Sequence, residues 1–275
     1  MSPIAWKKIR DDVVACMTAI KAERIRSERR RVLCKRLATL KSVISAARAA
    51  PPKRTAADEY KPRFPDLAVM PEVRALVEQQ NDAVVDRRSF EALLPNLPAW
   101  EQRWRDERTE ELRQLSLANS NFETREGVDP LGLARTTFRC KRCRRSCHYP
   151  VVLAHECRIY PPQLLATTVD ENGNRVPLDA YLYCVLATHP ILPLQLEDLE
   201  VSPHLADIDK IIALCGKDPS TATRQDMDEA DPRLAYDWSS MLGPSVMTWR
   251  RAVGRSSYFA VRFCNLTTVV RRSIT

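Results

Sequence analysis

The longest regular pattern of apolar and polar residues covers residues 4–49, a stretch without glycine or proline. Apolar residues recur there every three or four positions, which is typical of one face of an α-helix. They form two groups: Ile9, Val13, Cys16, Met17 and Ile20, and then Leu33, Leu37, Leu40 and Ile44. The charged stretch KAERIRSERRR separates the groups, and Pro51-Pro52 ends the pattern. We therefore predict a long basic helix over residues 1–50 that is partly free of the body of the protein.

The pattern then changes twice before residue 128. Residues 51–70 are rich in proline and irregular, which predicts a linker along the surface. Pro71 can open a short helix, and Asp86 and Asn96 stand where the N-caps of two further helices are expected. We predict a helical region over residues 71–127.

The remaining residues, 128–275, carry shorter segments. Asn172-Gly173 favours a tight hairpin, and the apolar spacing from His204 to Cys215 favours a helix. The run YLYCVLA is compatible with either a strand or a helix. This pattern predicts a small α+β region, so that the whole chain is mainly α-helical.

The low glycine content argues against the common nucleotide-dependent enzymes. The chain has 6 Gly, which never cluster, so neither GxGxxG nor GxxxxGK[ST] can be written. A phosphate-binding loop needs such glycines because the backbone must approach the anion closely. GxSxG and HExxH are also absent from the sequence. We therefore expect a protein that is not an enzyme.

Charge is unevenly distributed along the chain. Lys and Arg number 43 against 35 Asp and Glu, a formal net charge of +8. Residues 1–54 hold 15 basic and 4 acidic side chains, whereas residues 195–237 hold 4 basic and 11 acidic ones. No apolar run approaches the roughly 18–20 residues that span a bilayer, and the N-terminus lacks the apolar region of a signal peptide. We expect a soluble intracellular protein, in the cytoplasm or nucleus, without a membrane partner.

The 9 cysteines divide into two classes. A disulfide framework is not expected in a reducing compartment. Five cysteines are scattered, mostly among apolar neighbours, and are interpreted as small buried hydrophobic residues: Cys16, Cys34, Cys184, Cys215 and Cys264. The other four lie close together: Cys140, Cys143, Cys147 and Cys157.

The segment FRCKRCRRSCHYPVVLAHEC has the composition and spacing of a zinc site. The C-x2-C pair Cys140 and Cys143 can bring two thiolates to one ion from a single turn, and zinc then needs two more soft or borderline ligands. We favour His155 and Cys157, because residues 149–154 can return the chain to the turn. The alternative ligand set replaces His155 with His148. A third interpretation is that these cysteines are unrelated thiols in a surface loop and bind no metal.

A site with four protein ligands leaves no position for water or substrate, so the zinc is expected to be structural. Cross-braced RING modules bind two zinc ions with about eight ligands, and this segment offers six at most. The predicted fold class is therefore mainly α: a helical N-terminal region followed by a small zinc-stabilised α+β region.

Several segments resemble uncharacterised fungal F-box-associated proteins that carry a small CCHC-type zinc-binding element. They are FRCKRC…YPVVLAHEC with DPLGLARTT before it, FPDLAVMPEVRALVE, VDRRSFEALLPNLPAWEQRWRDERTEEL and DPRLAYDWSSMLGPSVMTWRRAV. The resemblance implies the ligands Cys140, Cys143, His155 and Cys157, and ubiquitin-ligase components as partners. Tyr236, Ser239 and Arg255 stand where this family often has a second Cys pair and a His, so a second site is not expected. No F-box is predicted, because residues 1–50 are too basic and lack the LP-type opening.

Three function classes follow. The favoured one is a non-enzymatic, zinc-stabilised module that binds other proteins, with adaptor function as a possibility that the resemblance adds. The alternative is nucleic-acid binding through a basic helix and a basic zinc knuckle; the candidate contacts, which would equally serve an acidic partner, are Arg29, Arg30, Arg31, Arg142, Arg144 and Arg145. An enzyme would need Cys147 and His148 to act together, and adjacent side chains on a strand point apart.

Overall fold

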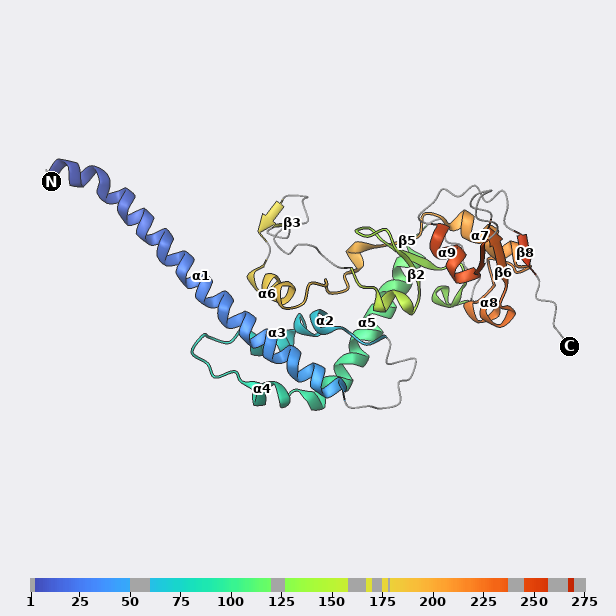
Figure 1. The fold of residues 1–275 in the computed structure, drawn as a ribbon, viewed down its shortest axis with the longest axis horizontal. Coiled ribbons are helices and arrows are strands. Elements are labelled where there is room, and N and C mark those ends of the chain that lie inside the picture. The colour runs from blue at the N-terminus through green and yellow to red at the C-terminus, as the bar shows by residue number, and fades with distance from the viewer. Residues whose placement is uncertain are drawn as a thin grey trace. The chain divides into compact units, whose positions relative to one another are not determined.

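The structure, a computed structural model, describes residues 3–49, 60–119, 127–157, 167–169, 175–177, 179–236, 245–256 and 267–269. It is mainly helical with small sheets, as predicted (Figure 1). The chain forms two compact units, each assembled from separate segments. Unit 1 comprises residues 1–53, 63–98 and 158–193, and unit 2 comprises residues 54–62, 99–157 and 194–275. The regions predicted from the sequence follow one another along the chain, whereas each of these units combines three separate segments.

Unit 1 is built on the long N-terminal helix α1. Its elements are α1 (Pro3–Ala49), α2 (Phe64–Ala68), α3 (Pro71–Val77), α4 (Arg87–Glu91), the 3-10 helix η2 (Leu94–Asn96), the hairpin strands β3 (Thr167–Val169) and β4 (Arg175–Pro177), and α6 (Ala180–Thr188). Helix α1 packs against α2, α3, α4 and α6. The run YLYCVLA, which the sequence left undecided, is helical, and Asn172-Gly173 lies outside the described residues.

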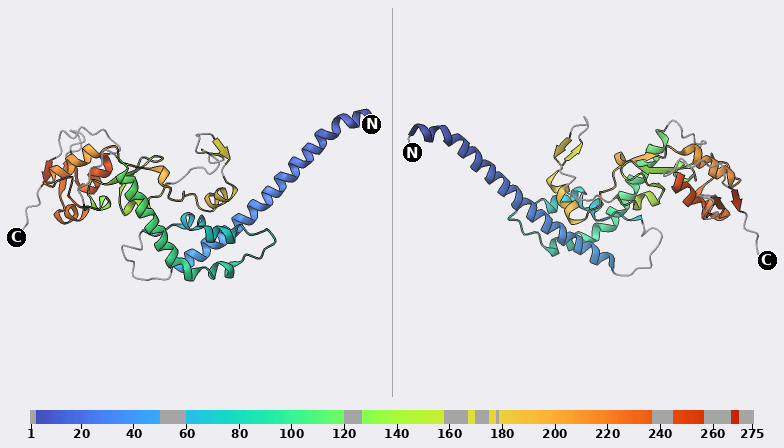
Figure 2. Two further views of the ribbon diagram at one scale, coloured as in Figure 1. Left: turned by 180° about the vertical axis from the view of Figure 1, so that it is seen from behind. Right: turned by 45° about the horizontal axis from the view of Figure 1, so that its top comes forward.

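The two halves of α1 have different environments. In the first half the apolar side chains described from Ile9 onward are exposed, Met17 by 61% and Ile20 by 58%. In the second half Leu33, Leu37 and Leu40 are buried, Leu37 completely. Figures 1 and 2 show the first half of α1 extending away from the other helices of unit 1. The long helix, free over part of its length, is thus confirmed, but Cys16 is exposed, which corrects its interpretation as a buried residue.

Two segments lie in surroundings that differ from those predicted for them. Residues 64–68, expected in a surface linker, form the buried helix α2, because Phe64 and Leu67 pack into unit 1; residues 51–59 lie outside the described residues. Helix α6, expected in the zinc-containing region, belongs to unit 1. It packs on α1, with Tyr181, Cys184, Val185 and Leu186 buried.

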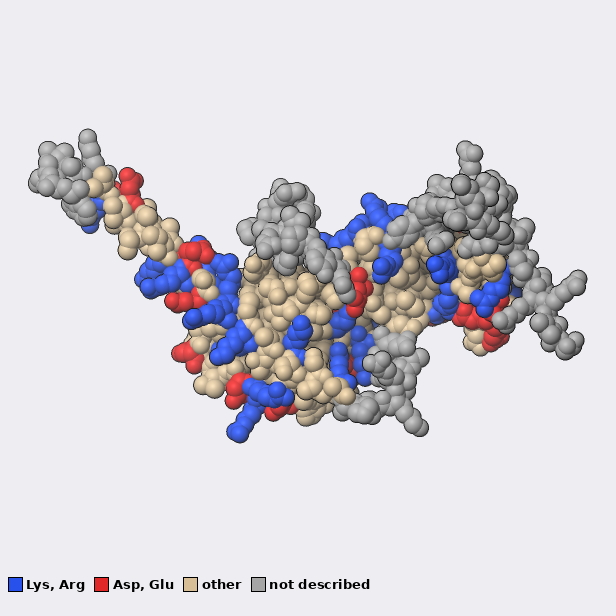
Figure 3. Space-filling view, in the orientation of Figure 1, with Lys and Arg blue, Asp and Glu red and all other residues tan. Residues whose placement is uncertain are grey.

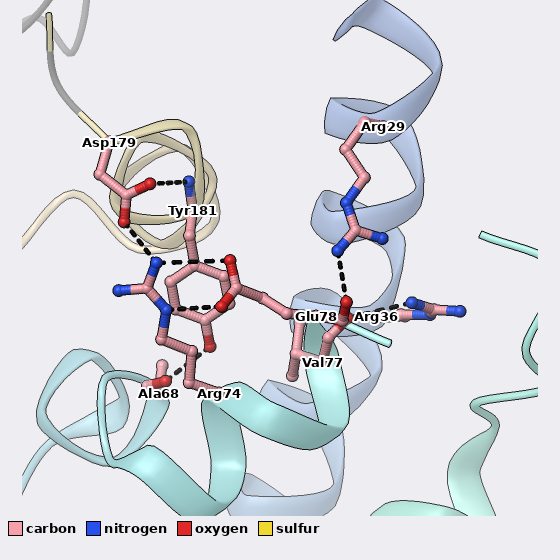
Figure 4. Close-up of polar contacts among 8 residues, drawn as sticks. All are labelled: Arg29, Arg36, Ala68, Arg74, Val77, Glu78, Asp179 and Tyr181. Atoms are coloured by element: carbon pink, nitrogen blue, oxygen red, sulfur yellow. Dashed lines mark hydrogen bonds and ion pairs between the residues drawn. The ribbon is translucent and has the colours of Figure 1, made fainter. Parts of the chain in front are cut away.

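Arginine side chains of α1 complete the C-terminal end of α3 (Figure 4). Arg29 donates to the carbonyl oxygens of Glu78 at 2.5 Å and Gln79 at 2.7 Å. Arg36 is buried and donates to the carbonyls of Val77, Gln79, Gln80 and Ala83 at 2.7–3.0 Å. The last carbonyls of a helix lack intrahelical partners, so these donors satisfy groups that would otherwise be costly to bury.

A second polar cluster joins α3 to α6 (Figure 4). Arg74 pairs with Glu78 at 2.7 Å and with Asp179 at 2.8 Å, and its guanidinium lies 4.7 Å from the centre of the Tyr181 ring. The Tyr181 hydroxyl donates to the carbonyl of Ala68 at 2.6 Å. These contacts fix the start of α6 on unit 1.

Unit 2 contains most of the second long helix and two small antiparallel sheets. Its elements are α5 (Leu97–Leu117, all but the first two residues), η3 (Pro130–Gly132), β1 (Thr137–Cys140), β2 (Ser146–His148), η4 (Val151–Ala154), η6 (Leu196–Asp198), β5 (Leu199–Val201), α7 (Leu205–Leu214), α8 (Arg224–Ala230), β6 (Arg233–Tyr236), β7 (Ser245–Thr248), α9 (Trp249–Ser256) and β8 (Thr267–Val269). The sheets have the strand orders β2-β1-β5 and β7-β6-β8.

An apolar cluster of unit 2 surrounds α7. Ile208, Ile211 and Ile212 are fully buried and share one face of this helix, as the spacing from His204 to Cys215 predicted. They pack with Met227 of α8 and with Trp249 and its neighbours on α9. The candidate metal residues lie at the end of β1, in the turn that follows it and just after η4.

Candidate metal centre

A tight turn between β1 and β2 brings the first two cysteines together. Cys140 is the last residue of β1, and its amide donates to the carbonyl of Arg145 at 2.9 Å. The amide of Arg144 returns to the carbonyl of Cys140 at 2.8 Å, with Arg144 in the left-handed region at φ 62°. This turn is the knuckle that the C-x2-C spacing predicts.

The other two candidate ligands follow η4. Val152 and Leu153 are buried and anchor this short 3-10 helix, and the amide of His155 donates to the carbonyl of Val152 at 3.0 Å. His155 then leaves the helix in an extended conformation. The apolar segment thus returns the chain to the knuckle, as the favoured ligand set requires.

Four potential ligand atoms converge at the knuckle. The thiol sulfurs of Cys140, Cys143 and Cys157 and a ring nitrogen of His155 all lie within 4.8 Å of one another. The Sγ atoms of Cys140 and Cys157 are 3.9 Å apart, and Cys143 Sγ is 3.4 Å from His155 Nε2. A zinc tetrahedron with ordinary Zn–S and Zn–N bonds has edges of about 3.5–3.8 Å. The residues therefore fit a tetrahedral ion.

The thiols are crowded in a way that a cation would relieve. Burial, and then the neighbouring Cys140, raise the pKa of Cys157 to about 12. Burial also raises the pKa of the Cys143 thiol. Three thiolates cannot coexist here without a positive charge among them, and a divalent ion, if bound, would supply that charge.

The alternative ligand His148 occupies a different environment. Its Nε2 lies 3.1 Å from the carbonyl oxygen of Ala134, and its ring meets Trp249 edge-on at 5.0 Å between centroids. Burial is the main cause that lowers the pKa of His148 to about 3, so the ring is neutral. Cys147 is half-buried, and burial raises its pKa to about 11. Both residues pack locally and neither joins the four-residue group.

The six candidate arginines fall into two groups. Three are engaged within the chain: Arg29 with the end of α3, Arg30 with Glu23 at 2.6 Å, and Arg142 with Asp198 at 2.7 Å. Arg31, Arg144 and Arg145 are exposed, and Arg142 is exposed as well although it is paired. Figure 3 shows Lys and Arg side chains gathered along the middle of α1.

Several contacts around this site could not be expected from the sequence. The hydroxyl oxygens of Tyr149 and Thr109 are 3.2 Å apart. The guanidinium of Arg224 lies over the Tyr149 ring, 5.6 Å from its centre. Lys141 donates to the carbonyl of Glu197 at 2.8 Å. These partners come from distant segments, so local spacing could not identify them. Ser239 and Cys264, named from the sequence, lie outside the described residues.

Comparison of the chain with protein-family models, curated proteins and solved structures finds no match. The resemblance to F-box-associated proteins therefore stays a prediction. Among the described residues, none of the helices combines the length and apolar character that crossing a membrane requires.

Proposed function

We propose that Cys140, Cys143, His155 and Cys157 hold one structural Zn²⁺, and that this ion stabilises a non-enzymatic protein-interaction module. The observation that carries the proposal is the convergence of three thiols and one imidazole within 4.8 Å. Thiolate and imidazole are the donors that zinc prefers, and four of them complete its tetrahedron. A closed site supports folding rather than chemistry at the metal.

The metal is tested by elemental analysis of the full chain purified in the presence of zinc. We expect about one zinc per chain, as for a single four-ligand site. The paired substitution Cys140→Ser with Cys143→Ser should lose it. The matched control is Cys147→Ser, which removes a nearby thiol outside the group and should keep the metal. A folded wild-type protein without bound metal would contradict the proposal.

Three observations support the interaction function. The four candidate ligands would leave no open position at the metal, apolar residues of α1 are exposed, and the sequence lacks common catalytic motifs. By resemblance, ubiquitin-ligase components are the first partners to test. Affinity capture with the intact chain should recover the same proteins before and after nuclease treatment. Recovery that nuclease abolishes would argue for the second candidate.

That second candidate is nucleic-acid binding, and the exposure of Arg31, Arg144 and Arg145 is the observation that favours it. Phosphate contacts make binding weaken steeply as salt rises. The test is a titration with an unrelated duplex and a single strand at two salt concentrations. Arg144→Ala with Arg145→Ala should weaken binding more than Arg142→Ala, because Arg142 is paired with Asp198. Absence of binding at low salt excludes this function.

A further inference from the structure

Helix α6 packs on α1, and each of these helices carries a cysteine outside the metal centre (Figure 1 labels both helices). Cys34 lies in the second half of α1 and is half-buried, and Cys184 lies in the middle of α6 and is fully buried. Both belong to unit 1, although 150 positions separate them in the sequence. Local spacing therefore gave no reason to pair them.

The contacts of Cys184 place its thiol over the turn of α1 that contains Cys34. The Cys184 Sγ lies 3.7 Å from the carbonyl oxygen of Arg30, one helical turn before Cys34. Side chains of a helix lean toward its N-terminus, so the Cys34 side chain covers this same turn. The Cys34 thiol is also close enough to the Cys184 thiol to raise its pKa.

The surrounding contacts keep α6 in place on α1. Lys41 donates to the carbonyl of Thr188 at 3.0 Å, at the end of α6. Tyr181 and Asp179 hold its beginning through Ala68 and Arg74. Because both ends of α6 are tied within unit 1, Cys184 stays beside the turn of α1 that ends at Cys34.

We propose that Cys34 and Cys184 form a reversible disulfide, so that the packing of α6 on α1 is a site of covalent modification. The oxidant is a low-molecular-weight disulfide of the glutathione type. The Cys34 thiolate attacks one sulfur of this disulfide, which gives a mixed disulfide and releases one thiol. Cys184 then loses its proton and attacks the Cys34 sulfur, which releases the second thiol. The two protein thiols are oxidised and the small disulfide is reduced to two thiols.

The roles of the two cysteines follow from their environments. Cys34 is half-exposed, so the small disulfide can reach it first. Burial, and then the Cys34 thiol, raise the pKa of Cys184 to about 12, which leaves it protonated and slow to react with reagents from solution. Cys184 therefore reacts second, with the sulfur placed beside it.

The test treats the full zinc-loaded chain with oxidised glutathione, blocks the remaining thiols under denaturing conditions and maps the peptides by mass spectrometry. We expect a cross-linked peptide that joins Cys34 to Cys184, reversed by dithiothreitol. The chain mass should fall by the two thiol hydrogens. The midpoint of thermal unfolding should rise, because the cross-link closes a long loop of the unfolded chain.

Matched variants separate this pair from other thiols. Cys184→Ser or Cys184→Ala should accumulate the glutathione adduct on Cys34, because the second thiol is missing. Cys16→Ser removes an exposed thiol of the same helix and should leave the cross-link unchanged. A lasting glutathione adduct on Cys34 of the wild-type chain, or a cross-link to a different cysteine, would overturn the proposal.

Discussion

Units 1 and 2 use different means to hold short elements together. Unit 1 packs helices on the second half of α1 and satisfies the end of α3 with Arg29 and Arg36. In unit 2 the strands beside the candidate metal group are only three or four residues long. Such short strands bury little apolar surface of their own. The comparison indicates that a long helix organises unit 1 by packing, whereas in unit 2 the proposed metal would add a cross-link beside the shortest strands.

The largest effect is expected from removal of the proposed metal, and we expect it to be confined to unit 2. A structural zinc site contributes about 10–16 kcal/mol in small domains, comparable to the whole stability of a domain. We expect a strong chelator to abolish the hydrogen-exchange protection of residues 137–148 while residues 33–44 of α1 stay protected. Exchange measured by mass spectrometry checks this, and renewed zinc should restore the protection. Equal loss in both units would remove the contrast between them.

An intermediate effect is expected from Arg36→Met in unit 1. The change keeps an apolar stem but leaves the carbonyls of Val77, Gln79, Gln80 and Ala83 without this donor. Hydrogen bonds from a charged donor contribute about 1.5–3 kcal/mol each and are not additive, so we expect a loss of about 3 kcal/mol in the free energy of unfolding. Urea unfolding followed by hydrogen exchange in unit 1 measures it.

The control for Arg36→Met is Arg31→Met on the same helix. Arg31 is exposed, so its replacement should change the free energy of unfolding by less than about 0.5 kcal/mol. Equal effects of the two variants would show that the carbonyl contacts contribute little.

The smallest predicted effect concerns His148 and pH. Its pKa is lowered from 6.5 to about 3 in the folded chain, chiefly by burial. The unfolded chain therefore binds the proton first, so this contribution to stability is present above pH 6.5 and is lost as pH falls toward 3. Between pH 7.5 and 5.5 we expect a loss of about 1.4 kcal/mol from this residue.

The variant His148→Gln isolates that contribution, because glutamine keeps a donor for the carbonyl of Ala134 but does not titrate. Urea unfolding of both proteins at pH 7.5 and pH 5.5 gives the change in the free energy of unfolding for each. Proton competition at the metal ligands affects both proteins equally, so it cancels in the comparison. The same pH dependence in the two proteins would mean that His148 is not held neutral by burial.

Several features could be predicted because neighbours along the chain determine them. The long helix, the cap at Asp86 and the helix around Ile208 depend on periodicity and on local hydrogen bonds. The four candidate ligands were also named from spacing, because a C-x2-C turn and a short return segment need no distant partner.

The long helix, the mainly helical fold class and the group Cys140, Cys143, His155 and Cys157 all follow from local sequence patterns. Three features became visible only in the folded chain: α6 packs on α1, residues 64–68 are buried, and Cys184 lies against the turn of α1 before Cys34. It also decided which arginines stay exposed. The reason is physical: periodicity reports which face of a segment is apolar, but not which distant segment covers that face.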